Sequence, residues 1–168
     1  MTKRKGFTLA ELLIVIAIII IIVTIVFVAL DPLTKYRNER VSSRWLDINS
    51  VIHAIKEDQR DNGGAYLSAI AKMREGVIYM VVDGSTVDSC NNQNENCVTN
   101  VTDASSCVDL SGLVEEGYLG KVPISPNGFG QWGPIMSGYT LQRDATNVLH
   151  IRACELENPD AAEIYISQ

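Results

Sequence analysis

The stretch KRKGFTLAE at residues 3–11, followed by LLIVIAIIIIIVTIVFVAL at residues 12–30, decides how this chain is built. Three basic residues precede a glycine, and the apolar run that follows has a single carboxylate, Glu11, near its start. Residues 12–30 carry no charge, and Thr24 is their one conventional polar side chain. At about 1.5 Å per residue this run spans roughly 28 Å as a helix, close to the thickness of the hydrocarbon core of a bilayer. The pattern predicts a membrane-spanning helix.

An ordinary membrane anchor and an uncleaved signal segment are the simplest interpretations of such a run. A secretory signal peptide has a shorter apolar core, and its small-residue cleavage site comes after that core. Here the candidate cleavage point, between Gly6 and Phe7, lies before the apolar run. Cleavage at this point leaves the apolar helix on the mature protein.

The order of basic leader, glycine, phenylalanine and a glutamate at the fifth mature position resembles the leader of type IV prepilins. These include the pilins and the pseudopilins of secretion and DNA-uptake systems. The residues that carry the resemblance are Lys3, Arg4, Lys5, Gly6, Phe7, Thr8, Leu9 and Glu11, with the helix that follows. The resemblance implies that a prepilin peptidase cleaves after Gly6 and that the new amine of Phe7 is methylated and keeps its positive charge.

Glu11 needs an explanation, because an isolated carboxylate at the edge of a bilayer core costs about 2–3 kcal/mol on insertion scales. One interpretation is that its side chain snorkels to the headgroups or is protonated. The resemblance implies another, in which the amine of Phe7 in one filament subunit pairs with Glu11 of its neighbour. Opposite charges attract strongly in a low dielectric, so such a pair helps to set the register between subunits.

The resemblance also implies a function, partners and a localisation. We expect a structural subunit of a type IV pilus-like filament, which packs against copies of itself and other pilins through its N-terminal helix and depends on the pilus assembly machinery. Before assembly, it is expected as a single-pass protein of the inner (cytoplasmic) membrane, with its C-terminal domain outside the cytoplasm; after assembly, in a surface filament. The basic leader agrees with the positive-inside rule. The alternatives are a pseudopilin of a type II secretion or DNA-uptake system and a non-filamentous, membrane-tethered binding module.

The composition argues against two other classes of protein. The formal net charge is −6, and removal of residues 1–6, which hold three basic side chains, lowers it to −9. Phosphate contacts need clustered Lys and Arg, so we expect no direct nucleic-acid binding. The sequence has no nucleophile elbow, P-loop, dinucleotide fingerprint or HExxH motif, so we expect neither an enzyme with catalytic residues nor a cofactor. Asp83 and Asp88 in a polar loop suggest calcium, but the EF-hand order is absent and we expect no metal.

Four cysteines, Cys90, Cys97, Cys107 and Cys154, lie in the part of the chain that is expected to be exported. An even count in an exported domain is typical of two disulfides, with three possible connectivities. A zinc site is the alternative, but the spacings lack the CxxC pairs of zinc ribbons. The expected pairing is Cys90–Cys97, which closes a small polar loop, and Cys107–Cys154, which ties the start of a short helix to a late strand.

The chain as a whole predicts an α+β fold, in which a long N-terminal helix packs against a small antiparallel sheet, as in pilins. We divide it into a leader peptide (1–6), a hydrophobic transmembrane or filament-core helix (7–31) and a C-terminal globular domain (32–168). Pro32 removes a backbone donor and predicts a kink where the amphipathic second half of the helix begins. The apolar stripe of this second half, which predicts packing on the domain, contains Val41, Trp45, Ile48, Ile52 and Ile55.

Apolar runs bounded by turn residues predict strands at 76–82, 138–142, 148–153 and 163–166. A short helix is expected at 109–114. Residues 127–138 contain four glycines and are expected to form a loop. Phe129 and Trp132 in this loop either mark an exposed contact surface or pack down onto the sheet.

Overall fold

The computed structural model of the chain describes residues 6–84, 89–157 and 162–168. The basic leader residues 1–5, and Asp88 with its suggested role in calcium binding, lie outside the described residues. The chain divides into two compact units, Met1–Asn38 and Glu39–Gln168.

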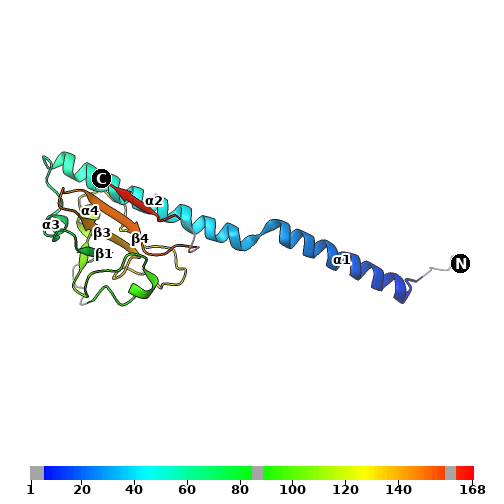
Figure 1. Cartoon of the computed structure of the whole chain (residues 1–168). Coiled ribbons are helices and arrows are strands. Elements are labelled where there is room, and N and C mark those ends of the chain that lie inside the picture. Colours follow the sequence, from blue (N-terminus) through cyan, green and yellow to red (C-terminus); the bar gives the residue numbers. More distant parts are fainter. Residues whose placement is uncertain (1–5, 85–88, 158–161) are drawn as a thin grey trace. The chain divides into compact units, whose positions relative to one another are not determined.

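The first unit is helical. Helix α1 (Leu9–Leu30), drawn in blue in Figure 1, is uncharged after Glu11 and has no buried residue. It ends at Asp31, whose φ of 34° is left-handed, and helix α2 (Pro32–Asp61) begins at the next residue. A proline is tolerated at the first helical position because the backbone N–H there has no partner within the helix.

The second unit contains a five-stranded mixed sheet and the part of α2 from Glu39 onwards (Figure 1). The strands are β1 (Ile78–Val82), β2 (Cys107–Asp109), β3 (Tyr139–Arg143), β4 (Leu149–Ala153) and β5 (Tyr165–Ser167), in the order β2-β1-β3-β4-β5. The connections contain α3 (Ser68–Ala71), the 3-10 helix η1 (Asn94–Asn96) and α4 (Ser111–Glu115). The α+β, pilin-like arrangement is therefore confirmed.

The sheet has one strand that the sequence did not predict. Strand β2 pairs with β1 in parallel, whereas the other three neighbouring pairs are antiparallel. With three residues at the end of a polar stretch, β2 is too short to show an alternating pattern.

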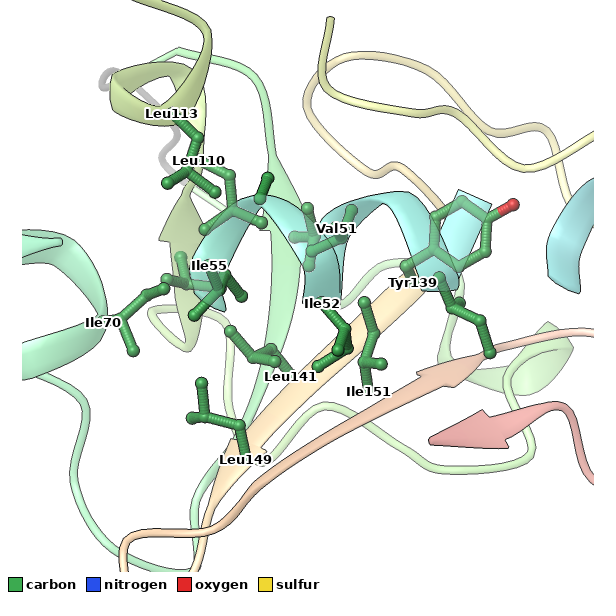
Figure 2. Packing of buried hydrophobic residues seen from close by; sticks show 14 of the residues in the cluster. Val51, Ile52, Ile55, Ile70, Leu110, Leu113, Tyr139, Leu141, Leu149 and Ile151 are labelled. Atoms are coloured by element: carbon green, nitrogen blue, oxygen red, sulfur yellow. The ribbon is translucent and has the colours of Figure 1, made fainter. Parts of the chain in front are cut away.

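Helix α2 covers one face of the sheet, and the main core lies between them. Figure 2 shows Val51, Ile52 and Ile55 of α2 against Leu141 and Ile151 of the sheet, and all five are buried. The core also takes in buried side chains of the connections, among them Ile70, Leu110 and Leu113.

The buried face of α2 is rotated relative to the predicted apolar stripe. Arg44, Ile48, Val51, Ile55 and Asp58 recur at steps of four and three, and all are buried. Trp45, expected in the core, is 38% exposed, and this part of the prediction was wrong. Arg44 takes the inward position instead, because acidic partners are available to it inside the domain.

A second, smaller core lies on the other face of the sheet. Along β1, Tyr79 and Val81 belong to the main core and Met80 and Val82 to the second, as expected for alternating side chains. The connections that flank the strands supply the rest of this second core, namely Cys90, Cys97, Val101, Trp132, Met136 and Cys154.

Two disulfides crosslink the connection between β1 and β2, and their connectivity differs from the prediction. Cys90 is bonded to Cys107, and Cys97 is bonded to Cys154. The expected pairing of Cys90 with Cys97 and of Cys107 with Cys154 was wrong. Cys90 lies beside the start of β2, since its N–H donates to the carbonyl of Ala104 at 3.3 Å.

A backbone hydrogen bond also lies beside the second disulfide, Cys97–Cys154. The N–H of Val98 donates to the carbonyl of Cys154 at 2.8 Å, which holds Cys97 at the end of β4. Tertiary contacts of the loop, rather than closeness in sequence, therefore select the pairs.

Candidate functional site

The three described residues before α1 are exposed in the single chain, and Thr8 has an extended backbone. Gly6, Phe7 and Thr8 precede the helix, and the side chain of Phe7 is 82% exposed. No atom lies within 4 Å of the position that a Cβ would take at Gly6. The Gly6–Phe7 peptide bond thus lies outside regular structure.

Glu11 closes a capping box with Thr8 at the start of α1. The backbone N–H and the hydroxyl of Thr8 each donate to Glu11 Oε2 at 2.9 Å. In return, the N–H of Glu11 donates to the Thr8 hydroxyl at 3.2 Å. This reciprocal pair satisfies two backbone donors that a helix start otherwise leaves without partners.

The sequence contains a signal for this cap that was not among the predictions. A threonine followed three residues later by a glutamate, just before an apolar run, is a capping-box pattern. Among the described residues, none donates a hydrogen bond to the second carboxylate oxygen, Oε1. A carboxylate offers about four acceptor positions, so Glu11 retains capacity for a further donor.

From Leu12 to Leu30, the surface of α1 carries no charged side chain. Leu9–Leu30 has no buried residue in the single chain, and Thr24 donates its hydroxyl to the carbonyl of Ile20 at 2.8 Å. That hydrogen bond satisfies the one hydroxyl within the apolar run, so α1 presents no polar group there that needs a partner.

Asp31 lies between the two helices. It follows the last residue of α1 and precedes Pro32, the first residue of α2. Its side chain accepts hydrogen bonds from the backbone N–H and the hydroxyl of Thr34, three residues on. This is the pattern of an N-cap aspartate followed by a proline at the first helical position. In the structure, α1 ends at Leu30 and α2 begins at Pro32.

Within the second unit, α2 carries a fully buried arginine, Arg44. Its Nη2 donates to Glu155 Oε2 at 2.7 Å, and its Nη1 donates to Glu157. Its Nε donates to the Ser125 hydroxyl at 2.9 Å, and Nη2 also reaches the carbonyl of Pro126 at 3.0 Å. Every side-chain nitrogen of Arg44 thus has an acceptor, which is the condition under which a buried charge is tolerated.

Arg40 and Glu157 complete this cluster, which we call the buried charge network (Arg40, Arg44, Glu155 and Glu157). Arg40 donates to both carboxylate oxygens of Glu157, from Nε at 2.8 Å and from Nη2. Its guanidinium, more than that of Arg44, holds the pKa of the Glu157 carboxyl below its ordinary value, against the opposing effect of burial. The same contact raises the pKa of Arg40. Two positive and two negative groups neutralise each other at neutral pH.

The buried charge network also fixes the glycine-rich loop at residues 127–138. The second oxygen of the Glu155 carboxylate accepts a hydrogen bond from the N–H of Gly130. A Cβ at Gly128 would lie 2.7 Å from Glu155 Oε2, so only glycine leaves room for the carboxylate there. No role was predicted from the sequence for Glu155 or Glu157.

The comparisons with known proteins concern the N-terminal segment. Residues 1–27 match the prokaryotic N-terminal methylation motif, which is the signature of the type IV prepilin leader. No curated protein and no solved structure matched the chain at a significant level. One helical stretch, Leu9–Asp61, is long and apolar enough to cross a membrane, with a mean hydropathy of 3.7 in its most apolar window. The motif and this helix agree with membrane anchoring before assembly.

Proposed function

We propose that this chain is a structural subunit of a type IV pilus-like filament, assembled from the membrane through its N-terminal helix. The observation that carries the proposal is the methylation motif at residues 1–27, which takes in most of a helix, Leu9–Leu30, without a single buried residue. A continuous apolar surface of this kind needs cover from lipid or from other helices. A bundle of many α1 helices supplies that cover once the subunit has left the bilayer.

Processing is the first step that the proposal requires. A prepilin peptidase cleaves between Gly6 and Phe7 on the cytoplasmic side of the membrane and methylates the amine of Phe7. The exposed, non-helical backbone at Gly6 and Phe7 supports this step, because a protease binds its substrate in an extended conformation. A glycine at the cleavage site fits a narrow catalytic cleft.

Assembly is the second step, and we assign its register to Phe7 and Glu11. The positively charged amine of Phe7 in one subunit pairs with Glu11 of the next. The geometry supports this role, because the cap with Thr8 uses Glu11 Oε2 and leaves Oε1 for a further donor. Burial of both charges costs about what their attraction returns, so the pair sets register more than it adds stability.

The location of the chain and its contacts change on assembly. Before assembly it is a single-pass protein of the cytoplasmic membrane with its C-terminal domain outside the cytoplasm. Afterwards it packs through α1 against copies of itself and other pilins in a surface filament. The break at Asp31 and Pro32 lets the helix bend where it leaves the apolar core of the filament.

The test combines mass spectrometry of the N-terminus with electron microscopy of sheared surface filaments. We expect mature protein that begins at a methylated Phe7 and that is recovered in the filaments. Gly6→Leu should block cleavage and leave the full-length chain in the membrane. Gly120→Ala is the matched control, because Gly120 is also exposed with no atom near its Cβ position, and it should be processed normally.

Three results separate the alternatives. A mature chain that begins at Met1 or Thr2 overturns the leader assignment. Normal processing without surface filaments indicates a pseudopilin of a type II secretion or DNA-uptake system. Processed chain that stays in the membrane as single copies indicates a tethered binding module.

A further inference from the structure

An open groove of about 460 Å³ lies on the second unit, beside an exposed aromatic ring. Phe129 and Met136 form its apolar part. Its polar part includes the amide side chains of Asn92, Asn96 and Gln131 and the carboxylate of Glu95. We call this the Phe129 groove.

The side chain of Phe129 lies in neither hydrophobic core. Its side chain is 81% exposed, whereas Trp132, three residues later in the same loop, is 7% exposed and belongs to the second core. Single exposed apolar side chains are common on protein surfaces, and Phe129 is of interest because it lines a groove together with polar side chains.

Two contacts fix the loop just after Phe129. The Gly130 N–H donates to the buried carboxylate of Glu155. The indole of Trp132 occupies the space that Cβ atoms at Gly130 and Gly138 would need. Bulkier residues at these glycines would displace the indole.

Two hydrogen bonds between Gln93 and Gln131 connect the two loops that form the groove. The side-chain amide of Gln93 donates to the carbonyl of Gln131, and its oxygen accepts from the N–H of Gln131 at 2.6 Å. The walls of the groove are therefore set before any ligand arrives, which reduces the entropy lost on binding.

The polar side chains of the groove are available for a ligand. Among the described residues, none forms a hydrogen bond with the side chains of Asn92, Glu95, Asn96 or Gln131. Each amide offers two donors and an acceptor oxygen, and the carboxylate adds acceptors. Such a set suits a ligand whose groups donate and accept at the same time, as hydroxyls do.

The charges exclude other classes of ligand. No lysine or arginine lines the described groove, so nothing neutralises a phosphate, a sulfate or an acidic sugar. Glu95 is its only carboxylate, whereas a calcium ion takes six to eight oxygens. The lining is mainly polar, so a purely apolar ligand gains little.

We propose that the Phe129 groove binds a neutral sugar residue of a glycan. One C–H face of the pyranose ring lies on the phenyl ring of Phe129, and its hydroxyls bond to Asn92, Asn96, Gln131 and Glu95. This binding is a property of the second unit and does not depend on filament assembly.

The experiment uses the full chain in lipid nanodiscs, because glycoside detergents would compete for the groove. The probes are neutral oligosaccharides that end in galactose, glucose, mannose, N-acetylgalactosamine or N-acetylglucosamine, with a sialylated oligosaccharide as the acidic arm. Binding is measured by saturation-transfer NMR and by calorimetry. We expect binding of at least one neutral probe and none of the acidic probe.

Variants locate the site. Phe129→Ala should weaken binding of the neutral probe by at least about tenfold, which corresponds to about 1.4 kcal/mol, and Phe129→Tyr should retain it. Asn96→Ala should weaken it as well. Ile135→Ala is the matched control, since Ile135 is also exposed in this loop but does not line the groove, and it should stay within about twofold of wild type.

Failure is visible in the same measurements. The proposal is overturned if no neutral probe binds, if the acidic probe binds as well as the neutral ones, or if Phe129→Ala binds sugar like wild type. In the last case, loss of contacts between chains in Phe129→Ala would identify the surface as a protein interface. Two-dimensional NMR spectra confirm that each variant is folded.

Discussion

Glu11 Oε2 accepts hydrogen bonds from both the backbone N–H and the hydroxyl of Thr8, each at 2.9 Å, so this carboxylate already caps α1 in the single chain. Any effect of a Glu11 substitution on assembly therefore has two candidate causes, loss of the cap and loss of the charge. Glu11→Gln separates them, because glutamine also serves at this position of a capping box but carries no charge.

We predict that Glu11→Gln and Glu11→Ala both insert into the membrane with intact disulfides but enter filaments poorly, since neither can pair with the amine of Phe7. Glu11→Asp should assemble in part. Thr8→Ala, which loses the cap at a cost of about 1 kcal/mol but keeps the charge, should assemble nearly normally. The measurement is a blot of sheared filaments and membranes from cells that express each variant.

Two outcomes count against the charge pair. Normal filament yield from Glu11→Gln would show that the cap, not the charge, is what assembly needs. Absence of the Glu11 variants from the membrane would show that this residue acts before assembly.

The second prediction concerns Arg44. Arg44→Met leaves Glu155 buried without its cation, and loss of one partner of a buried ion pair typically costs about 3–5 kcal/mol of unfolding free energy. Arg60→Met is the matched control on the exposed side of α2, and a surface substitution of this kind should change stability by less than about 0.5 kcal/mol. Urea unfolding in nanodiscs, followed by tryptophan fluorescence, measures both. Equal stability of the two variants would contradict the structural role of Arg44.

The third prediction is a pH dependence carried by Glu157. Arg40, and after it Arg44, lower the pKa of this carboxyl in the folded state relative to the unfolded chain, where a glutamate titrates near about 4.3. A depressed folded pKa adds stability that is fully present above the unfolded pKa and disappears as the pH falls through the folded pKa.

The stability advantage of wild type over Glu157→Gln should therefore be largest near neutral pH and shrink as the pH falls below about 4.3. Unfolding free energies at a series of pH values from neutral to strongly acidic measure this difference. An advantage that stays constant over the series would mean that the charge of Glu157 does not contribute. Glu115→Gln is the control, because Glu115 is exposed and forms no ion pair with any other described residue.

The fourth prediction concerns the two disulfides. Cys97–Cys154 has a sequence separation of 57 and Cys90–Cys107 one of 17. In the chain-entropy model, these closures are worth roughly 4 and 3 kcal/mol. The Cys97→Ser/Cys154→Ser pair should therefore destabilise the domain more than Cys90→Ser/Cys107→Ser.

Peptide mapping without reduction checks the connectivity itself. Peptides that link Cys90 to Cys97 would contradict the structure, and free thiols in protein taken from the cell surface would contradict both disulfides. Near-equal losses of stability in the two double variants would indicate that strain or the unfolded state outweighs loop length.

The sequence predicted the parts of the fold that have local, periodic signals. Examples are the helix of the apolar run and the strands near 78–82, 139–143 and 149–153, which depend on neighbours in the chain. The disulfide pairing and the parallel strand β2 depend on contacts between distant segments, and no short pattern encodes them.

The buried charge network was missed for a different reason. A charged side chain in an amphipathic helix is normally assigned to the solvent face, and this moved the predicted stripe of α2 onto Trp45. The spacing of Arg44 to Ile48 and Val51 placed it on the apolar face all the same. The acids that pair with it lie more than a hundred residues away in the chain.

Cys154 and Glu155 are adjacent, and one is tied covalently to Cys97 while the other is paired with Arg44. A tensile load on α2 reaches the sheet through the main core and through the ion pair of Arg44 with Glu155, the neighbour of a covalent anchor. When such a load unfolds the domain, the chain between Cys97 and Cys154 stays closed in a loop by the disulfide. At about 3.4 Å per residue, the 57-residue separation withholds roughly 190 Å of contour length from extension for as long as the disulfide is intact. Under force, the unfolded domain should therefore extend to a shorter length when the disulfide is oxidised than when it is reduced.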